Sequence, residues 1–193
     1  MRDASGSRVG PRSRRFWRFR RTGAAMALAI ALAGIAAPAA FAAEPVTVPM
    51  EPSVSEFGPN EVCEDAVRVE TPRLRGTTTT FPKGRNGVVL DISVGYATTL
   101  VTNVDSRATY TFRGSFLISI VTFRDGSQRA DAFGPGVWAW YLAGDPSELG
   151  TGLFQIKRHA SETYDAAGNM VKATADGPTT DLCAKVGSGP VMP

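Results

Sequence analysis

Residues 108–123 read ATYTFRGSFLISIVTF, a run that carries apolar side chains on both faces of any strand it forms. In an extended chain the side chain of Phe116 points one way and that of Leu117 points the other. A strand that is apolar on both faces needs cover on each side, as in packed sheets or in a barrel with an apolar interior. The run is longer than an average strand, and Gly114 predicts a bulge or bend within it.

The flanking segments are also typical of strands. Residues 88–94 alternate, with apolar side chains at the even positions and Asp91 at the centre of the polar face. β-branched residues dominate residues 98–104, and the Asp-Gly pair in residues 124–127 predicts a tight hairpin. Further strands are predicted at residues 153–159 and 170–175, with a turn at 165–169.

This pattern predicts an all-β domain over residues 61–187. We expect an antiparallel barrel of seven to nine strands, closed or nearly closed; a β-sandwich is the alternative, and the sequence alone does not separate the two. Residues 43–60 contain four prolines and little alternation, which favours a flexible or draped arm. Residues 188–193 are predicted to form a flexible tail.

The N-terminal 42 residues have the layout of a secretory signal peptide. Eight arginines precede an uncharged, alanine-rich stretch that ends in Ala40-Phe41-Ala42, so we predict cleavage after Ala42 and secretion of the remainder. The apolar stretch is shorter than the about 20 residues of a spanning helix, and we expect no membrane span after cleavage. Ser13-Arg14-Arg15 leaves the twin-arginine route open beside the general secretory route, which we favour.

Removal of the signal changes the charge of the protein. The whole chain has 21 basic and 18 acidic residues, a net charge of +3. Residues 1–42 hold eight of the basic residues and one of the acidic residues, which leaves 13 basic against 17 acidic and a net charge of −4. Nucleic-acid binding rests on a positive field, so we expect no nucleic-acid partner.

The mature chain has one pair of cysteines, Cys63 and Cys183, near the two ends of the predicted domain. In an exported chain an even number of cysteines favours a disulfide over a metal site or a nucleophile. We therefore predict a Cys63–Cys183 bridge that holds the first and last elements side by side.

Residues 136–145 read GVWAWYLAGD, and their aromatic side chains could form either a binding platform or part of the core. In a strand, Trp138 and Trp140 share one face and Tyr141 lies on the other, and both faces are apolar. Large aromatic side chains are the usual filling of a β core, so we interpret this strand mainly as core. The alternative is an apolar lumen that receives a ligand.

The order of these sequence features along the chain resembles that of a known group of proteins. It runs from Cys63 through the Gly84-Arg85 pair, the hairpin region LVTNVDSRATYTFRGSF, the aromatic strand and YDAAGNMV to DLCAKV. Over roughly residues 63–186 the chain resembles a group of small secreted proteins from actinomycete-type bacteria. More loosely, its strand count and length are similar to those of the allene oxide cyclase and dirigent barrels. The first resemblance implies a fold and an export route, and the second implies a barrel family that handles apolar small molecules.

The sequence offers little to catalysis. His159 is the only histidine, and no H-E-x-x-H, C-x-x-C, G-x-S-x-G or EF-hand motif is present. We interpret His159 as a surface residue and assign no catalytic residue, metal ligand or cofactor.

Two classes of function remain open. The first is a secreted, non-enzymatic module that binds an apolar small molecule or a protein partner. Its candidate ligand-binding residues are Trp138, Trp140, Tyr141, Asp91 and Arg113. The second is a small isomerase or cyclase that uses Asp91, Tyr110 or Arg113 inside the barrel, because a buried carboxylate can act as a general base and an inward arginine can hold an anion. A purely structural envelope protein is a third option. We favour the binding module.

Overall fold

The computed structural model describes residues 44–82, 84 and 87–191, and the predicted signal peptide lies outside that range. Eleven strands and one short helix cover the described part, in chain order β1 (Val46–Pro49), β2 (Val54–Phe57), β3 (Val67–Phe81), β4 (Val89–Asn103), β5 (Thr109–Thr122), β6 (Gln128–Phe133), β7 (Val137–Tyr141), β8 (Gly152–Ile156), β9 (His159–Tyr164), β10 (Met170–Asp176), β11 (Thr179–Asp181) and α1 (Leu182–Lys185). The all-β prediction is confirmed.

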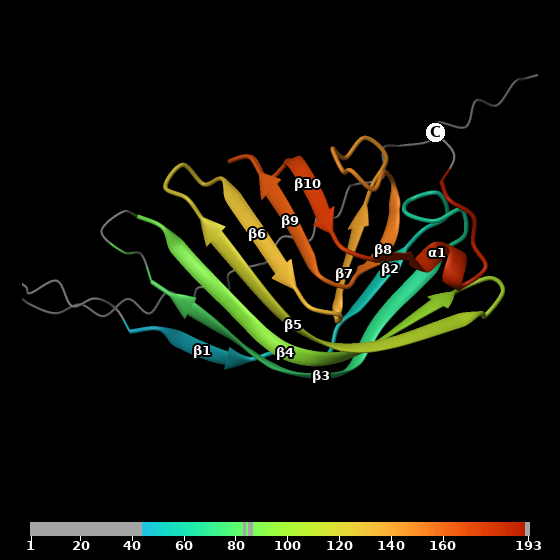
Figure 1. Cartoon of the computed structure of the whole chain (residues 1–193), viewed down its shortest axis with the longest axis horizontal. Helices are drawn as coiled ribbons and strands as arrows, with labels where there is room; N and C mark the ends of the chain where they lie inside the picture. Colours follow the sequence, from blue (N-terminus) through green and yellow to red (C-terminus); the bar gives the residue numbers. More distant parts are fainter. Residues whose placement is uncertain (1–43, 83, 85–86, 192–193) are drawn as a thin grey trace, which may run out of the picture. The chain divides into compact units, whose positions relative to one another are not determined.

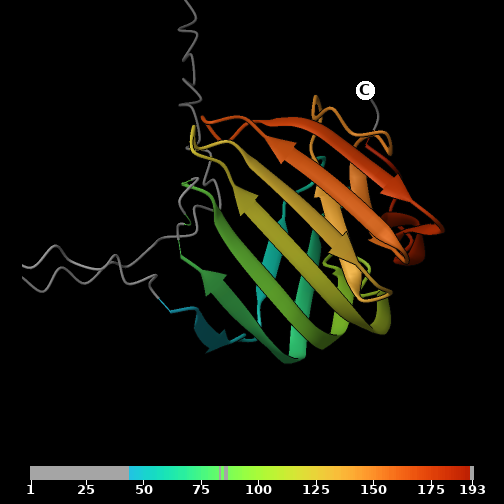
Figure 2. The same ribbon diagram turned by 60° about the vertical axis from the view of Figure 1, so that its left-hand side comes forward.

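The strands form two antiparallel sheets. The main sheet has eight strands in the order β1-β3-β4-β5-β6-β9-β10, with β2 also paired to β3. The second sheet has three strands in the order β11-β8-β7. Figures 1 and 2 show the long strands β3, β4 and β5 curving around the second sheet, which lies on their concave side. Within the described residues neither sheet closes on itself, so an open, sandwich-like arrangement fits as well as the barrel we expected.

The curvature of the main sheet comes from long strands that cross small residues. β3 and β4 have 15 residues each and β5 has 14. Gly76 on β3 pairs with Gly95 on β4, and a Cβ at Gly95 would come within 2.9 Å of the ring of Phe116. Because neither glycine has a side chain, the two strands can bend there and Phe116 can pack against the backbone of Gly95 on the concave face.

The predicted proline-rich arm is not loose in the structure. β1 and β2 run along the outer edge of β3, with β2 against residues 67–70 and β1 against residues 77–80. Between them β3 shifts register from Glu70 to Arg73, and Pro72, which has no N–H to give to the ladder, lies at that shift. The arm therefore extends the main sheet and covers its edge.

The predicted disulfide is present. Cys63 and Cys183 are bonded, with their Cα atoms 5.5 Å apart. Around the bridge lies a core cluster that includes Val67, Val101 and Leu182, all fully buried. A second cluster fills the space between the sheets, where Phe116 and Ala160 of the main sheet meet β7 and β8.

The chain beyond α1 is also tied to the domain, although we expected a flexible tail there. The backbone N–H of Asp65 donates to the hydroxyl of Ser188, 2.9 Å away, and the N–H of Glu64 donates to the carbonyl of Gly189 at 3.0 Å. Ser188 is buried. The ordered domain therefore reaches at least Gly189.

Both predicted hairpin turns are confirmed. Gly126 follows Asp125 with a φ of 91° between β5 and β6, and Gly168 has a φ of 85° between β9 and β10. Only glycine adopts these angles without strain.

Candidate functional site

A cavity of about 330 Å³ lies between the concave face of the main sheet and strand β7. Its wall is predominantly apolar and draws on both sheets. The lining side chains and backbone belong to Met50, Ser53, Thr71, Leu74, Ala97, Phe116, Ile118, Ile120, Ala130, Ala132, Gly136, Val137, Trp138, Ala139, Trp140, Ala160 and Glu162. Ligand-binding pockets commonly have volumes of about 300–1,000 Å³ and walls of this character.

Strand β7 borders the cavity because it is the edge strand of the second sheet. β8 pairs with one side of β7, and the other side faces the cavity. Side chains from both faces of the strand therefore reach the wall. The Trp138 and Trp140 rings lie 5.3 Å apart between centroids, and Trp140 is also 5.7 Å from Phe57.

Two glycines hold the start of β7 against the main sheet. A Cβ at Gly114 on β5 would lie 2.4 Å from the backbone nitrogen of Gly136, which donates to the carbonyl of Ser115 at 3.0 Å. Of the bulge or bend that we predicted at Gly114, the bulge does not occur, because β4 and β5 pair without a register shift. The glycine instead provides the close approach that sets the position of β7 over the cavity.

Glu162 is the charged residue of the cavity wall. It lies on β9, on the same face as Ala160, and is partly buried. The hydroxyl of Tyr164 donates to its Oε2 at 2.6 Å. The other polar side chains of the wall, Ser53 and Thr71, bond to each other at 2.7 Å.

A second tyrosine lies beside this carboxylate. Tyr141 is fully buried, and its hydroxyl has no hydrogen-bond partner within the described residues. Burial, together with the negative charge of Glu162, raises the pKa of Tyr141 well above its usual value, and the same two causes raise the pKa of Tyr164. Both phenols therefore remain protonated donors at neutral pH.

No family model, curated protein or solved structure matches this chain. The resemblance to secreted actinomycete-type proteins stays a prediction.

The cavity brings together only part of the predicted ligand-binding set. Trp138 and Trp140 lie on its wall, whereas Tyr141 lies next to it with its side chain in the core. Asp91 lies on the concave face, because it pairs with the wall residue Ile120, but it accepts a hydrogen bond from Thr80 at 2.6 Å and is not part of the wall. Arg113 is exposed on the outer face of β5.

The proposed isomerase residues do not converge. Tyr110 packs against the disulfide cluster, with the Lys185 ammonium 5.8 Å from its ring, and Arg113 points away from the cavity. Asp91, Tyr110 and Arg113 thus occupy three different environments. An active site built from these three residues is not supported.

Sequence reasoning missed Glu162 and Tyr164. Their strand, HASETY, alternates, so Ala160, Glu162 and Tyr164 share a face. A glutamate in an alternating strand is usually on the solvent side, and only the pairing of β9 with β6 places this one toward the second sheet. The sequence signal that could have indicated this is that the two neighbours of Glu162 on the same face, Ala160 and Tyr164, are a small and an aromatic residue.

His159 lies on the outer face, partly exposed, as the sequence predicted for a surface residue. Its Nε2 lies 3.2 Å from a carboxylate oxygen of Asp131, and its ring stacks on Phe133 with centroids 4.5 Å apart. Partial burial opposes ionisation of Asp131, but hydrogen bonds from Arg129, Ser161 and His159 hold its pKa below the usual range. The group is a surface cluster built around the Arg129–Asp131 ion pair.

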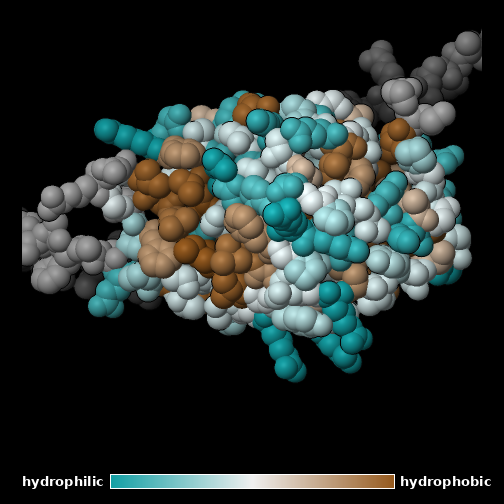
Figure 3. Space-filling view, viewed as in Figure 1, coloured by the Kyte–Doolittle hydropathy of each residue, from teal (hydrophilic) through white to brown (hydrophobic). Residues whose placement is uncertain are grey.

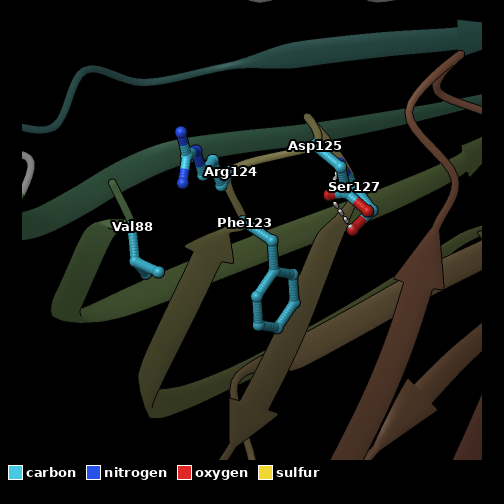
Figure 4. Close-up of a pocket in the computed structure, with 5 residues that line it drawn as sticks. All are labelled: Val88, Phe123, Arg124, Asp125 and Ser127. Atoms are coloured by element: carbon cyan, nitrogen blue, oxygen red, sulfur yellow. Dashed lines mark hydrogen bonds between the residues drawn. The ribbon is translucent and has the colours of Figure 1, made fainter. Parts of the chain in front are cut away.

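A second hollow, of about 590 Å³, lies at the hairpin end of the main sheet and is lined by Val88, Phe123, Arg124, Asp125 and Ser127 (Figure 4). The Asp125 carboxylate already accepts hydrogen bonds from the Ser127 hydroxyl at 2.7 Å and from its N–H at 2.9 Å. Those bonds close the turn and lower the pKa of Asp125. The polar groups of Asp125 and Ser127 are therefore used within the hairpin.

The outer face of the main sheet carries an apolar stripe. Val94, Leu117 and Phe133 are directly paired across β4, β5 and β6, and each is more than 40% exposed. Figure 3 shows hydrophobic side chains gathered on this face. The apolar side of residues 88–94 thus faces outward.

The described residues contain no cluster of three or more His, Cys, Asp or Glu side chains that could hold a metal ion. In that same part of the chain, no helix is long and apolar enough to cross a bilayer.

Proposed function

We propose that this protein is a secreted binding module that holds an apolar or amphipathic small molecule between its two sheets. The observation that carries the proposal is the inter-sheet cavity, which has an apolar wall and two indole side chains on one strand. Burial of apolar surface would supply the affinity, at about 25 cal/mol per Å² of apolar area removed from water. The predicted signal peptide and the disulfide support secretion.

The proposal holds whether the fold is described as a nearly closed barrel or as a sandwich, because both descriptions place a curved sheet opposite β7. A protein partner is a weaker candidate for the cavity, since the wall is concave and its volume suits a small molecule.

Mass spectrometry of solvent extracts tests the proposal. The protein is purified after secretion from two unrelated hosts and extracted. We expect an apolar molecule in about stoichiometric amount, or, from an empty preparation, saturable binding of a long-chain alcohol.

The Trp140→Ala variant should lose most of this binding, because Trp140 lies on the wall and is 39% exposed, which makes the variant less disruptive to the core than Trp138→Ala. Tyr96→Ala is the matched control, since Tyr96 is an exposed aromatic residue on the outer face. Blank extracts together with no saturable binding would contradict the proposal and favour a structural role.

A further inference from the structure

The chemistry of the cavity wall points to the kind of head group that the ligand carries. We infer that the bound molecule is a long-chain amine, whose ammonium group pairs with Glu162 while its apolar chain lies along Trp138 and Trp140. This inference rests on the proposed function and adds the polar end of the ligand to it.

The first observation is that Glu162 has no cationic partner. None of the salt bridges between described residues includes it, and the groups beside its carboxylate are neutral hydroxyls, that of Tyr164, which donates to Oε2 at 2.6 Å, and that of Tyr141. A carboxylate offers about four acceptor positions. Acceptor capacity therefore remains on a charged group at an apolar wall.

The second observation is the sign of the surrounding charge. The charged groups that act on the buried Tyr141 are both carboxylates, those of Glu162 and Asp145. The Asp145 carboxylate also accepts a hydrogen bond, from the N–H of Leu142 at 2.7 Å. Glu162 is the charged residue of the wall, so an anionic head group beside it would meet repulsion, whereas a cation would be attracted.

The third observation is that the Glu162 carboxylate lies on a predominantly apolar wall, where its desolvation costs free energy. A carboxylate beside apolar side chains is poorly solvated, and a cation that donates hydrogen bonds to it offsets that cost. Charge-assisted hydrogen bonds of this kind are stronger than those between neutral groups. Indole rings nearby also favour a cation over an anion, through cation–π attraction.

Glu162 and Tyr164 would then act together. The Tyr164 hydroxyl donates to Oε2 of the carboxylate at 2.6 Å, so Oε1 would be the atom that receives the ammonium group. Ser53 and Thr71, which bond to each other elsewhere on the wall, do not compete for the head group. The cavity therefore has one anionic anchor, and the rest of its wall is uncharged and predominantly apolar.

The test compares three probes that share a ten-carbon alkyl chain and differ in their head groups: decylamine, decanol and decanoate, each below its micellar concentration. Binding is followed by tryptophan fluorescence and by calorimetry. The chain has three tryptophans, and Trp17 lies in the predicted signal peptide, so the fluorescence of the secreted protein reports on the two tryptophans at the cavity wall. We expect decylamine to bind at least about tenfold more tightly than decanol, and decanoate to bind more weakly than either.

The deciding variant is Glu162→Gln, which keeps an acceptor for Tyr164 and removes the charge. We expect it to bind decylamine and decanol within about threefold of each other. Glu148→Gln is the matched control, because Glu148 is exposed and lies outside the cavity wall, and it should keep the preference for the amine. Thermal unfolding curves of both variants confirm that each is folded.

The outcomes separate the two proposals. If decanol or decanoate binds as tightly as decylamine, or if Glu162→Gln keeps the preference for the amine, the head-group inference is overturned while the binding function stands. If none of the three probes binds to the wild-type protein, the proposed function itself fails.

Discussion

At the scale of single residues, the site depends on two glycines and two tyrosines. Gly114 and Gly136 let β5 and β7 touch backbone to backbone, and this contact positions the tryptophans of β7. Tyr141 and Tyr164 place phenol groups beside Glu162 in a poorly solvated environment. Each feature leads to a prediction that needs no knowledge of the ligand.

Gly114→Ala should destabilise the protein by about 1–3 kcal/mol, because its Cβ would lie 2.4 Å from a backbone atom that has no room to move. The measurement is urea unfolding followed by circular dichroism. Gly84→Ala is the control, since nothing lies within 4 Å of a Cβ at that position, and its stability should be unchanged. An unchanged midpoint for Gly114→Ala would show that β7 is not held by this contact.

Tyr141→Phe should make the protein more resistant to alkaline unfolding. The folded-state pKa of Tyr141 lies above its ordinary value of 10.0, so the stabilisation is complete below about pH 10 and is lost as the pH rises above it, where the unfolded chain ionises first. Below pH 10 the variant should be at least as stable as the wild type, because the buried Tyr141 hydroxyl has no partner among the described residues and its removal leaves no other group unsatisfied.

The measurement for Tyr141 is the unfolding free energy as a function of pH. Tyr96→Phe, at an exposed position, is the control and should leave the alkaline limb of the curve in place. An alkaline limb that Tyr141→Phe does not move would contradict the assignment of this group.

At the scale of elements, the disulfide joins the segment before β3 to α1. The helix has four residues and is capped by Asp181, whose carboxylate accepts a hydrogen bond from the N–H of Ala184 at 3.1 Å. A helix this short has little stability of its own. Its place is maintained by the bridge and by burial of Leu182 and Cys183 in the first core cluster.

Removal of the bridge in the Cys63→Ala/Cys183→Ala variant should cost up to about 4–5 kcal/mol, because a loop closed over 120 residues strongly restricts the unfolded chain. Thermal unfolding with and without reductant measures the effect. The wild type should shift on reduction and the variant should not. A wild type that is insensitive to a reductant shown to open the bridge would refute this account.

At the scale of the whole molecule, the predicted cleavage after Ala42 would change the charge of the protein. The full chain has a net charge of +3 and an isoelectric point near 9.1, but residues 43–193 carry a net charge of −4. A moderately negative mature protein would also attract a cationic amphiphile in preference to an anionic one, although salt weakens such long-range attraction.

The secreted protein should therefore focus below pH 7 and have an intact mass that begins at Ala43. Isoelectric focusing and mass spectrometry of the protein recovered from the culture medium measure both. The unprocessed chain, recovered from the cytoplasm of a host with its export blocked, is the reference and should focus near pH 9.1. A secreted species that still carries residues 1–42 would disprove the predicted cleavage.

The sequence by itself was sufficient for features that depend on local chemistry or on a simple count. Alternation and β-branched residues predicted the all-β class, Asp-Gly predicted the β5–β6 hairpin, and the single pair of cysteines in the mature chain predicted the bridge. Each of these signals is complete within a few residues or within the composition. The strand of Trp138 and Trp140 could also be recognised in this way.

The tertiary structure alone decided which face of each strand points inward. Period-two alternation divides a strand into two faces but does not say which is covered, and the pairing of β4 with β5 placed Asp91 inside and Val94 outside, the reverse of what hydropathy suggests. The same reason explains why Glu162 was missed. A cavity wall is assembled from strands far apart in sequence, so its one charge becomes visible only when β6, β7 and β9 are brought together.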